Sequence, residues 1–120
     1  MRDLVNLIFK DADPSDYAKK LCSELEKNKW VALNYSPLDQ VVCPKNLLPQ
    51  GPGVLITSGG SSGKPHRCLL PSTHLNKSAD ATAKWLNQEG INPESCIIFN
   101  PLPMHHVSGL MPWWRSMRWR

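Results

Sequence analysis

The sequence predicts an α/β fold, because short apolar runs alternate with stretches of helical periodicity. Three continuous apolar runs, at residues 30–33, 54–56 and 96–99, are expected to be strands. Two stretches, at about residues 14–27 and 73–90, carry apolar residues at helical spacing. The chain has 120 residues, the length of one domain, and its 41% hydrophobic and 20% charged residues are ordinary for a globular protein.

The first helix is expected to run from Pro14 to about Lys27. Asp13 precedes it as an N-cap, and Pro14 suits the first helical position. The apolar residues that recur at helical spacing inside it are Tyr17, Leu21 and Leu25. This periodicity predicts an amphipathic helix whose charged residues face solvent.

The second helix is expected after Pro71, beyond an irregular, proline-punctuated connection at residues 36–52 and the apolar run at 54–56. Ser72 or Thr73 is expected to cap it, and Gly90 is expected to end it. Its apolar face is formed by Leu75, Ala79, Thr82 and Leu86. The run at 96–99 then reads as a parallel strand covered on both faces, followed by a loop at 100–109 where open α/β sheets bind ligands.

The bulk properties exclude several classes of protein. The net charge of +4 is spread along the chain, which suits an anionic ligand without requiring nucleic acid. The four cysteines form no C-x-x-C pair, so free and mostly buried thiols are expected. Neither a signal peptide nor a membrane-spanning run is visible, and a cytoplasmic location is expected.

The richest candidate site is the stretch of small and hydroxylated residues at 57–67, directly after the apolar run at 54–56. Glycines allow successive backbone N–H groups to converge on one anion, and hydroxyl groups and cations add donors to phosphate oxygens. We therefore expect a nucleoside triphosphate, ATP, as the ligand. The residues expected to bind its phosphates are Thr57, Ser58, Gly59, Gly60, Ser61, Ser62, Gly63, Lys64 and Arg67.

Two other interpretations of this stretch are a P-loop and a flexible connection. A P-loop requires glycine where Ser58 stands and Ser or Thr where Pro65 stands, so the sequence does not match it. Because Pro65 disfavours a helix, the chain is expected to turn back into a second extended segment at 68–70. A flexible Gly/Ser connection between two hairpin strands remains an alternative.

Two motifs together resemble one superfamily. Residues 57–65, Thr-Ser-Gly-Gly-Ser-Ser-Gly-Lys-Pro, resemble the phosphate-binding signature of the AMP-forming adenylating enzymes, which include acyl-CoA synthetases, adenylation domains and luciferases. That signature normally continues with Lys or Arg after the proline, whereas here His66 holds this place and Arg67 follows. Residues 101–110, Pro-Leu-Pro-Met-His-His-Val-Ser-Gly-Leu, resemble the superfamily's second motif, on the wall of the acyl pocket. The combination is most similar to o-succinylbenzoate-CoA ligases.

The resemblance implies an activity and further ligands. Such enzymes of menaquinone and phylloquinone biosynthesis activate a carboxylate with ATP and Mg²⁺, and then transfer the acyl group to coenzyme A. The resemblance assigns His106 and Gly109 to the acyl-substrate site and thiol tunnel, and Arg67 as a stand-in for the displaced cation. It implies that residues 1–120 are a fragment of the large amino-terminal domain, without catalytic residues or metal ligands. Ligase activity is therefore expected only together with the remainder of the polypeptide, which carries the catalytic lysine.

Several alternatives remain open. The acid substrate could be another aryl or fatty acid, or the chain could be a non-catalytic nucleotide-binding module. Metal binding by His105 and His106 is disfavoured by their adjacency, and a Ser108–His106 nucleophile lacks a nucleophile elbow. The tryptophan- and arginine-rich end, 111–120, could contact bases or a membrane surface. The resemblance instead implies a helix whose tryptophans are core residues left exposed by truncation.

Overall fold

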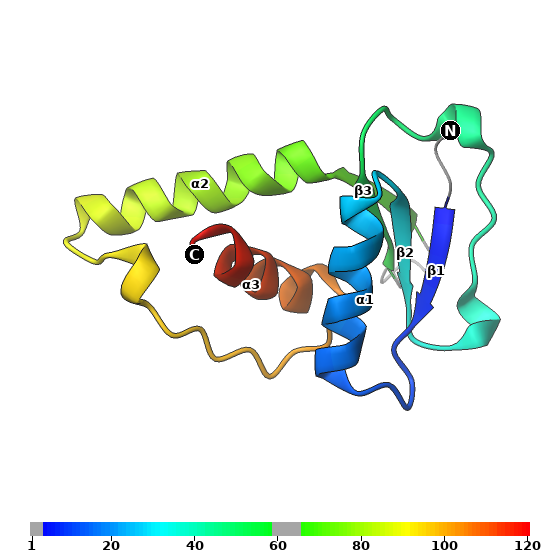
Figure 1. Ribbon diagram of the computed structural model, residues 1–120, viewed down its shortest axis with the longest axis horizontal. Helices are drawn as coiled ribbons and strands as arrows, with labels where there is room; N and C mark the ends of the chain where they lie inside the picture. Colours follow the sequence, from blue (N-terminus) through cyan, green and yellow to red (C-terminus); the bar gives the residue numbers. More distant parts are fainter. Residues whose placement is uncertain (1–3, 59–65) are drawn as a thin grey trace. The chain divides into compact units, whose positions relative to one another are not determined.

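The computed structural model describes residues 4–58 and 66–120 of the chain, and four strands in them form one mixed sheet. The strand order is β1 (Leu4–Ile8), β2 (Trp30–Asn34), β3 (Gly53–Ser58) and β4 (His66–Pro71). The first three strands are parallel, and β4 is antiparallel to β3 (Figure 1). Together with three α-helices, this sheet confirms the predicted α/β class.

The first helix, α1 (Pro14–Glu26), connects β1 to β2 and lies against the sheet (Figure 1). The carboxylate of Asp13 accepts hydrogen bonds from the backbone N–H groups of Ser15 and Asp16, at 2.8 and 3.3 Å. Tyr17 and Leu21 are buried, and this burial raises the pKa of the Tyr17 phenol. The predicted N-cap and apolar stripe are therefore confirmed.

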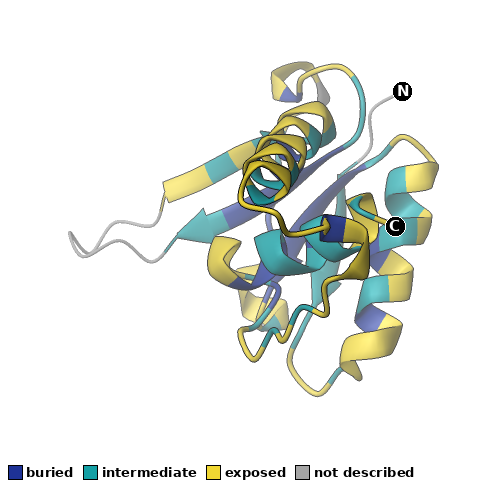
Figure 2. Cartoon of the chain, turned by 90° about the vertical axis from the view of Figure 1, so that its left-hand side faces the viewer, coloured by how far each residue is buried: buried dark blue, intermediate teal, exposed yellow. Residues whose placement is uncertain are grey.

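The centre of the sheet is formed by β2 and β3, whose apolar residues are buried (Figure 2). Continuous apolar runs are typical of parallel strands covered on both faces. The Trp30 ring fills the space that a Cβ at Gly53 would need, and its indole N–H donates to the Pro49 carbonyl at 3.0 Å. The apolar pattern does not predict β1, because Asn6 interrupts its run.

The connection between β2 and β3 contains two single-turn 3₁₀ helices, η1 (Pro37–Asp39) and η2 (Lys45–Leu47). The Ser36 side chain accepts from the backbone N–H of Leu38, and Asp39 accepts from that of Ser36 at 3.0 Å. This reciprocal capping satisfies backbone N–H groups at the start of η1, so the single turn is stabilised without a longer helix.

The chain divides into two compact units, Met1–Ser72 and Thr73–Arg120. The second unit contains most of α2 (Ser72–Gln88), the 3₁₀ turn η3 (Pro93–Ser95) and α3 (Val107–Arg118). Gly90 has a positive φ of 81°, and the N–H of Ile91 donates to the Leu86 carbonyl at 2.9 Å. Gly90 thus ends α2 as predicted.

The expected cap at the start of α2 is wrong for Ser72. Ser72 is the first helical residue, and its Oγ makes no hydrogen bond in the described part of the chain. Its backbone N–H donates to the Pro52 carbonyl at 3.0 Å, which continues the pairing of β4 with β3. The helix therefore follows the strand directly, without a capping residue between them.

The predicted strand at 96–99 is wrong. These residues follow η3 in no regular element, and Ile97 is 97% exposed and Phe99 86% exposed. An apolar run becomes a strand only when another strand satisfies its backbone groups, and no described strand pairs with this one. The loop predicted at 100–109 ends earlier than expected, because its last three residues, 107–109, are the first residues of α3.

The tryptophans of the last segment belong to the packing of α3 beside α2 (Figure 1). The Trp114 indole donates to Oδ1 of Asn76, and the Trp119 indole donates to the Ala79 carbonyl, each at 2.9 Å. Trp114 is only 8% exposed, so the expectation that these tryptophans are left exposed is wrong for this residue. It is wrong because α2 supplies hydrogen-bond partners that hold the indoles of Trp114 and Trp119 against it.

The surface differs from the expectation for the cysteines. None of the four is in a disulfide, but Cys22, Cys43 and Cys68 are only half-buried and Cys96 is exposed.

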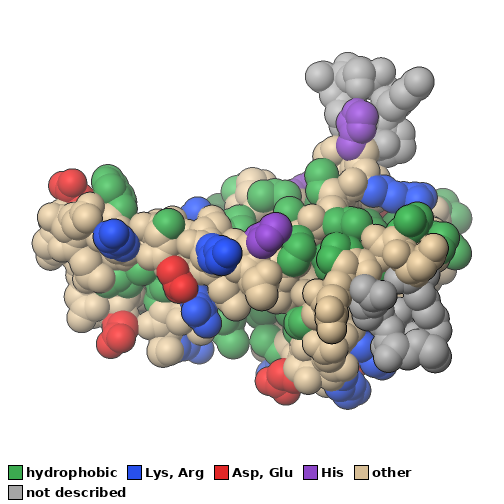
Figure 3. Space-filling view, turned by 90° about the horizontal axis from the view of Figure 1, so that it is seen from above, with side chains coloured by type: hydrophobic (Ala, Val, Ile, Leu, Met, Phe, Trp, Pro, Cys, Tyr) green, Lys and Arg blue, Asp and Glu red, His purple; other side chains and the backbone are tan. Residues whose placement is uncertain are grey.

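The face drawn in Figure 3 shows Lys and Arg side chains scattered among Asp and Glu side chains. None of the helices in the described residues combines the length and the apolar character needed to span a membrane.

Candidate functional site

The first candidate site is the end of the β3–β4 hairpin at which residues 59–65 connect the two strands. Thr57 pairs with Arg67, and Ser58 pairs with His66. The Ser58 hydroxyl donates to the His66 carbonyl at 3.3 Å. The chain turns back into an extended segment after Pro65, as predicted, so the glycine-rich stretch connects two hydrogen-bonded strands.

The structure covers three of the nine residues expected to bind phosphates. Thr57, Ser58 and Arg67 lie on the hairpin itself. The other six lie outside the described residues: Gly59, Gly60, Ser61, Ser62, Gly63 and Lys64. Their expected role as phosphate ligands therefore stays a prediction.

The two faces of the hairpin end carry different side chains. Residues directly opposite each other on antiparallel strands share a face, whereas successive residues alternate. Arg67 therefore lies on the same face as Thr57, and His66 lies on the face of Ser58. A cation at position 66 and a cation at position 67 would consequently approach a ligand from opposite sides.

The chemistry of these four residues suits an anion. They provide two hydroxyl groups, one imidazole and one guanidinium, and no carboxylate. His66 and Arg67 are exposed, and Thr57 and Ser58 are half-buried. Hydroxyl and guanidinium groups donate charge-assisted hydrogen bonds to phosphate oxygens, so this donor set fits a polyphosphate.

The second candidate site is the turn that leads into α3, in the second unit. His106 occupies the N-cap position with extended backbone, and its carbonyl accepts from the N–H groups of Gly109 and Leu110, at 3.0 and 2.8 Å. The His106 ring is exposed and lies beside that of His105, with ring centroids 4.3 Å apart. The imidazole is thus held at the start of a helix and remains accessible to a ligand.

Gly109 is buried in the first turn of α3, not in a loop. A Cβ at this position would collide with the carbonyl group of Pro103. The Asn100 side-chain amide donates to the Gly109 carbonyl at 2.7 Å, which fastens residues 100–103 against the helix. This close backbone approach gives the glycine a packing reason that is independent of any ligand.

The described residues contain no evident metal site. Within residues 4–58 and 66–120, no three His, Cys, Asp or Glu side chains are grouped closely enough to hold a metal ion. The described contacts likewise include no hydrogen bond between Ser108 and His106, so the geometry adds no support for that nucleophile pair.

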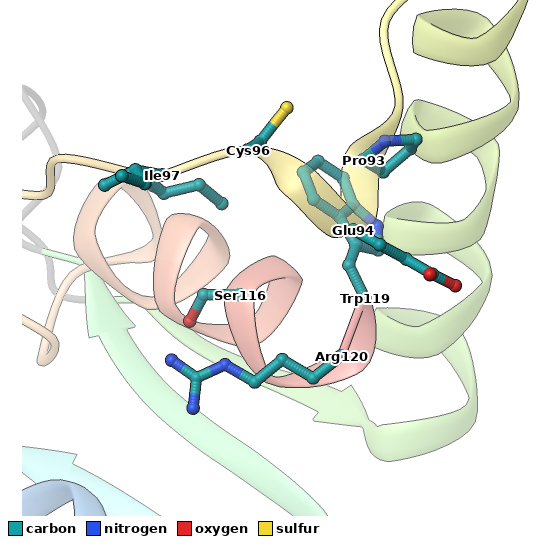
Figure 4. A pocket seen from close by; sticks show the side chains of 8 residues that line it. Pro93, Glu94, Cys96, Ile97, Ser116, Trp119 and Arg120 are labelled. Atoms are coloured by element: carbon teal, nitrogen blue, oxygen red, sulfur yellow. The ribbon is translucent and has the colours of Figure 1, made fainter.

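Sequence reasoning missed a cavity in the second unit (Figure 4). It has a volume of about 250 Å³ and is lined by polar and apolar side chains in equal number: Glu94, Ser116, Arg120 and Trp119 with its indole N–H, and Pro93, Cys96, Ile97 and Ile98. Trp119 and Arg120 follow α3, Ser116 lies one turn earlier, and Glu94 and Cys96 come from η3 and the residue after it. Of the interleaved tryptophans and arginines at the end of the sequence, only Trp119 and Arg120 line it, and periodicity cannot show that η3 lies beside the end of α3.

Comparison of the chain with protein-family models, with curated proteins and with solved structures found no match. The function proposed for this chain therefore depends on its own motifs and on the geometry of the hairpin end and of the turn before α3.

Proposed function

We propose that residues 1–120 carry the ATP-phosphate-binding and acyl-site segments of an AMP-forming acid–CoA ligase. The proposed acid is o-succinylbenzoate, an intermediate of menaquinone and phylloquinone biosynthesis. Its carboxylate attacks the α-phosphorus of ATP and releases pyrophosphate, which leaves an acyl-adenylate. The thiol of coenzyme A then attacks the acyl carbon and releases AMP, so a thioester replaces the anhydride.

One observation carries this proposal: Thr57 and Arg67 share a face at the end of a hairpin whose connection contains the glycine-rich motif. The buried strand β3 fixes one end of that connection, and its pairing with β4 fixes the other. A phosphate-binding loop stabilises developing charge best when its donors are held in place before the reaction. This arrangement supports a role for residues 57–67 in binding the β- and γ-phosphates.

The register also supports a specific role for Arg67. Because Arg67 shares a face with Thr57 and not with His66, it would contact the phosphates from the Thr57 side. The guanidinium would supply a charge-assisted hydrogen bond that a neutral imidazole does not. Arg67 would thus supply the positive charge of the motif's displaced cation, but from the face opposite to that of position 66.

The acyl site is proposed at the turn before α3. The exposed His106 ring would border the acyl group, and the close packing of Gly109 against Pro103 would set the direction of the turn. Mg²⁺ would enter with ATP and neutralise phosphate charge. Its protein ligands are expected outside this chain.

The experiment that tests the proposal has two parts. Calorimetric titration of the 120-residue chain with Mg-ATP and with Mg-pyrophosphate measures phosphate binding directly. The variant Lys64→Ala is expected to weaken both interactions, whereas Lys84→Ala, which removes the same charge from an exposed position in α2, is the matched control. Equal affinity of Lys64→Ala and the parent chain would contradict the phosphate role.

The second part is ATP–pyrophosphate exchange by the longest continuous form of the protein, with and without o-succinylbenzoate. Exchange that depends on this acid would support both the reaction and the substrate. Exchange with other carboxylates alone would keep the reaction and reject the substrate. A folded protein that binds Mg-ATP without exchange would instead be a nucleotide-binding module.

A further inference from the structure

Asn100 lies at the start of the turn before α3, and its side chain makes hydrogen bonds in two directions. Its Nδ2 donates to the Gly109 carbonyl at 2.7 Å, and its Oδ1 accepts from the backbone N–H of Leu102 at 3.3 Å. The side chain is half-buried, so water competes less for these bonds than at an exposed position. One side chain thus joins the first turn of α3 to the segment that leads into it.

The same turn holds the backbone of His106 from both sides. The His106 N–H donates to the Pro103 carbonyl at 3.3 Å, and the His106 carbonyl accepts from the N–H groups of Gly109 and Leu110. Gly109 approaches Pro103 so closely that no Cβ fits between them. The His106 side chain makes no capping hydrogen bond at the start of α3. The backbone of this turn therefore determines where the imidazole stands.

We propose that Asn100 is a positioning residue for the acyl site, acting through Gly109 and Pro103 on the place of the His106 ring. This inference rests on the proposed function, which assigns His106 to the border of the acyl group. Asn100 itself need not touch the substrate. Without its side chain, residues 100–103 lose their bond to α3, and His106 loses the fixed turn that directs its ring. A displacement of about 1 Å in a site can cost up to about 100-fold in rate.

The two hydrogen bonds explain why the side chain is an amide. The Gly109 carbonyl can only accept and the Leu102 N–H can only donate, so position 100 must supply both a donor and an acceptor. An ionised aspartate supplies acceptors alone and would set its charge against the Gly109 carbonyl. Asn100→Asp therefore keeps the bond to Leu102 and loses the bond to Gly109, whereas Asn100→Ala loses both.

The first measurement follows the His106 ring in the 120-residue chain by NMR. The rings of His105 and His106 lie 4.3 Å apart, so each ring shifts the carbon-bound proton signals of the other. Asn100→Ala and Asn100→Asp are each expected to move the His106 signals toward those of an exposed histidine such as His74. Asn87→Ala removes the same amide from an exposed position in α2 and should leave the His106 signals in place.

A second control separates positioning from a loss of stability. Asp80→Asn removes the ion pair with Arg118, at the far end of α3. It weakens the same unit of the chain without touching the turn at residues 100–109, so the His106 signals should stay in place. Circular dichroism checks that every variant keeps its helices.

The second measurement is ATP–pyrophosphate exchange by the longest continuous form of the protein. Asn100→Ala and Asn100→Asp should each raise the KM for o-succinylbenzoate by at least about tenfold. The KM for ATP should change little, because the proposed phosphate ligands belong to the β3–β4 hairpin and its connection and not to the turn before α3. Asn87→Ala should change neither constant.

Two results would overturn the role of Asn100. One is a set of His106 ring signals that stays in place in both Asn100 variants, or that Asp80→Asn moves equally. The other is a KM for the acid that does not change, or that rises no more than the KM for ATP. A parent form without exchange would reject the proposed function and the acyl-site role with it, whereas unmoved ring signals in an active parent would reject Asn100 alone.

Discussion

Asn6 and Asn34 lie on neighbouring strands, and the side-chain amide of Asn34 donates to Oδ1 of Asn6 at 2.9 Å. The same oxygen accepts from the backbone N–H of Val41 at 2.9 Å, and the Asn6 amide donates to the Val41 carbonyl at 3.0 Å. Asn34 is 3% exposed, so its polar groups depend on these partners. The pair ties the edge strand β1 to β2 and to the connection that follows η1.

Replacing Asn6 by alanine should lower the free energy of unfolding by about 1–3 kcal/mol, because the Val41 N–H loses its acceptor and the Asn34 amide keeps only the Ala32 carbonyl, at 3.4 Å. Urea denaturation measures this loss. Asn46→Ala, at an exposed position in η2, removes the same side chain and should have little effect. Equal stability of Asn6→Ala and the parent chain would mean that water replaces the lost acceptor.

Gly109→Ala should destabilise the chain by about 1–3 kcal/mol, because a Cβ collides with the Pro103 carbonyl and strains the packing. The sign is informative, since glycine to alanine in an unobstructed helix stabilises by about 0.5–1 kcal/mol. Thermal unfolding followed by tryptophan fluorescence measures the change. Ser108→Ala, at the neighbouring exposed position, is the control. A stabilised Gly109→Ala would contradict the close approach.

The ion pair between Asp80 and Arg118 predicts a pH-dependent contribution to stability. The hydrogen bond from Arg118, with N–O distances of 3.0 Å, lowers the pKa of the Asp80 carboxyl. The contribution is therefore fully present above the ordinary pKa of an aspartate, and it is lost as pH falls through the lowered value. Both side chains are about half exposed, so the effect is small and weakens with salt.

Asp80→Asn tests this pH dependence. Its Tm should lie slightly below that of the parent chain at neutral pH, and the difference should disappear in acid. Glu89→Gln removes one exposed carboxylate just beyond α2 and should show no such convergence. A Tm difference that stays constant with pH would mean that Asp80→Asn acts through something other than the loss of the carboxylate charge.

Arg67→Gln should weaken Mg-ATP binding by about tenfold, the loss expected for one charge-assisted hydrogen bond. His66→Gln should have a smaller effect, because its side chain lies on the opposite face of the hairpin. Calorimetric titration compares the two variants. A larger effect at His66 would place the bound phosphates on the Ser58 face and reject the proposed role of Arg67.

Local chemistry explains what could be predicted. The Asp13 cap, the proline after it and the apolar spacing defined α1, and Gly90 defined the end of α2. Pro65 indicated the return into β4 because a proline acts on its own neighbours. The glycine-rich motif and the motif around His106 could also be found by reading residues in order.

The remaining features depend on contacts between distant residues. The sequence alone determined the α/β class, both long helices and the position of the candidate motifs, because caps, turns and periodicity act over a few residues. Only the tertiary structure decided that Arg67 shares a face with Thr57, that Trp114 is buried against α2, and that residues 96–99 have no strand beside them. Strand pairing and helix packing join backbone groups and side chains that lie far apart in the chain, and an apolar run carries no record of which partner it meets.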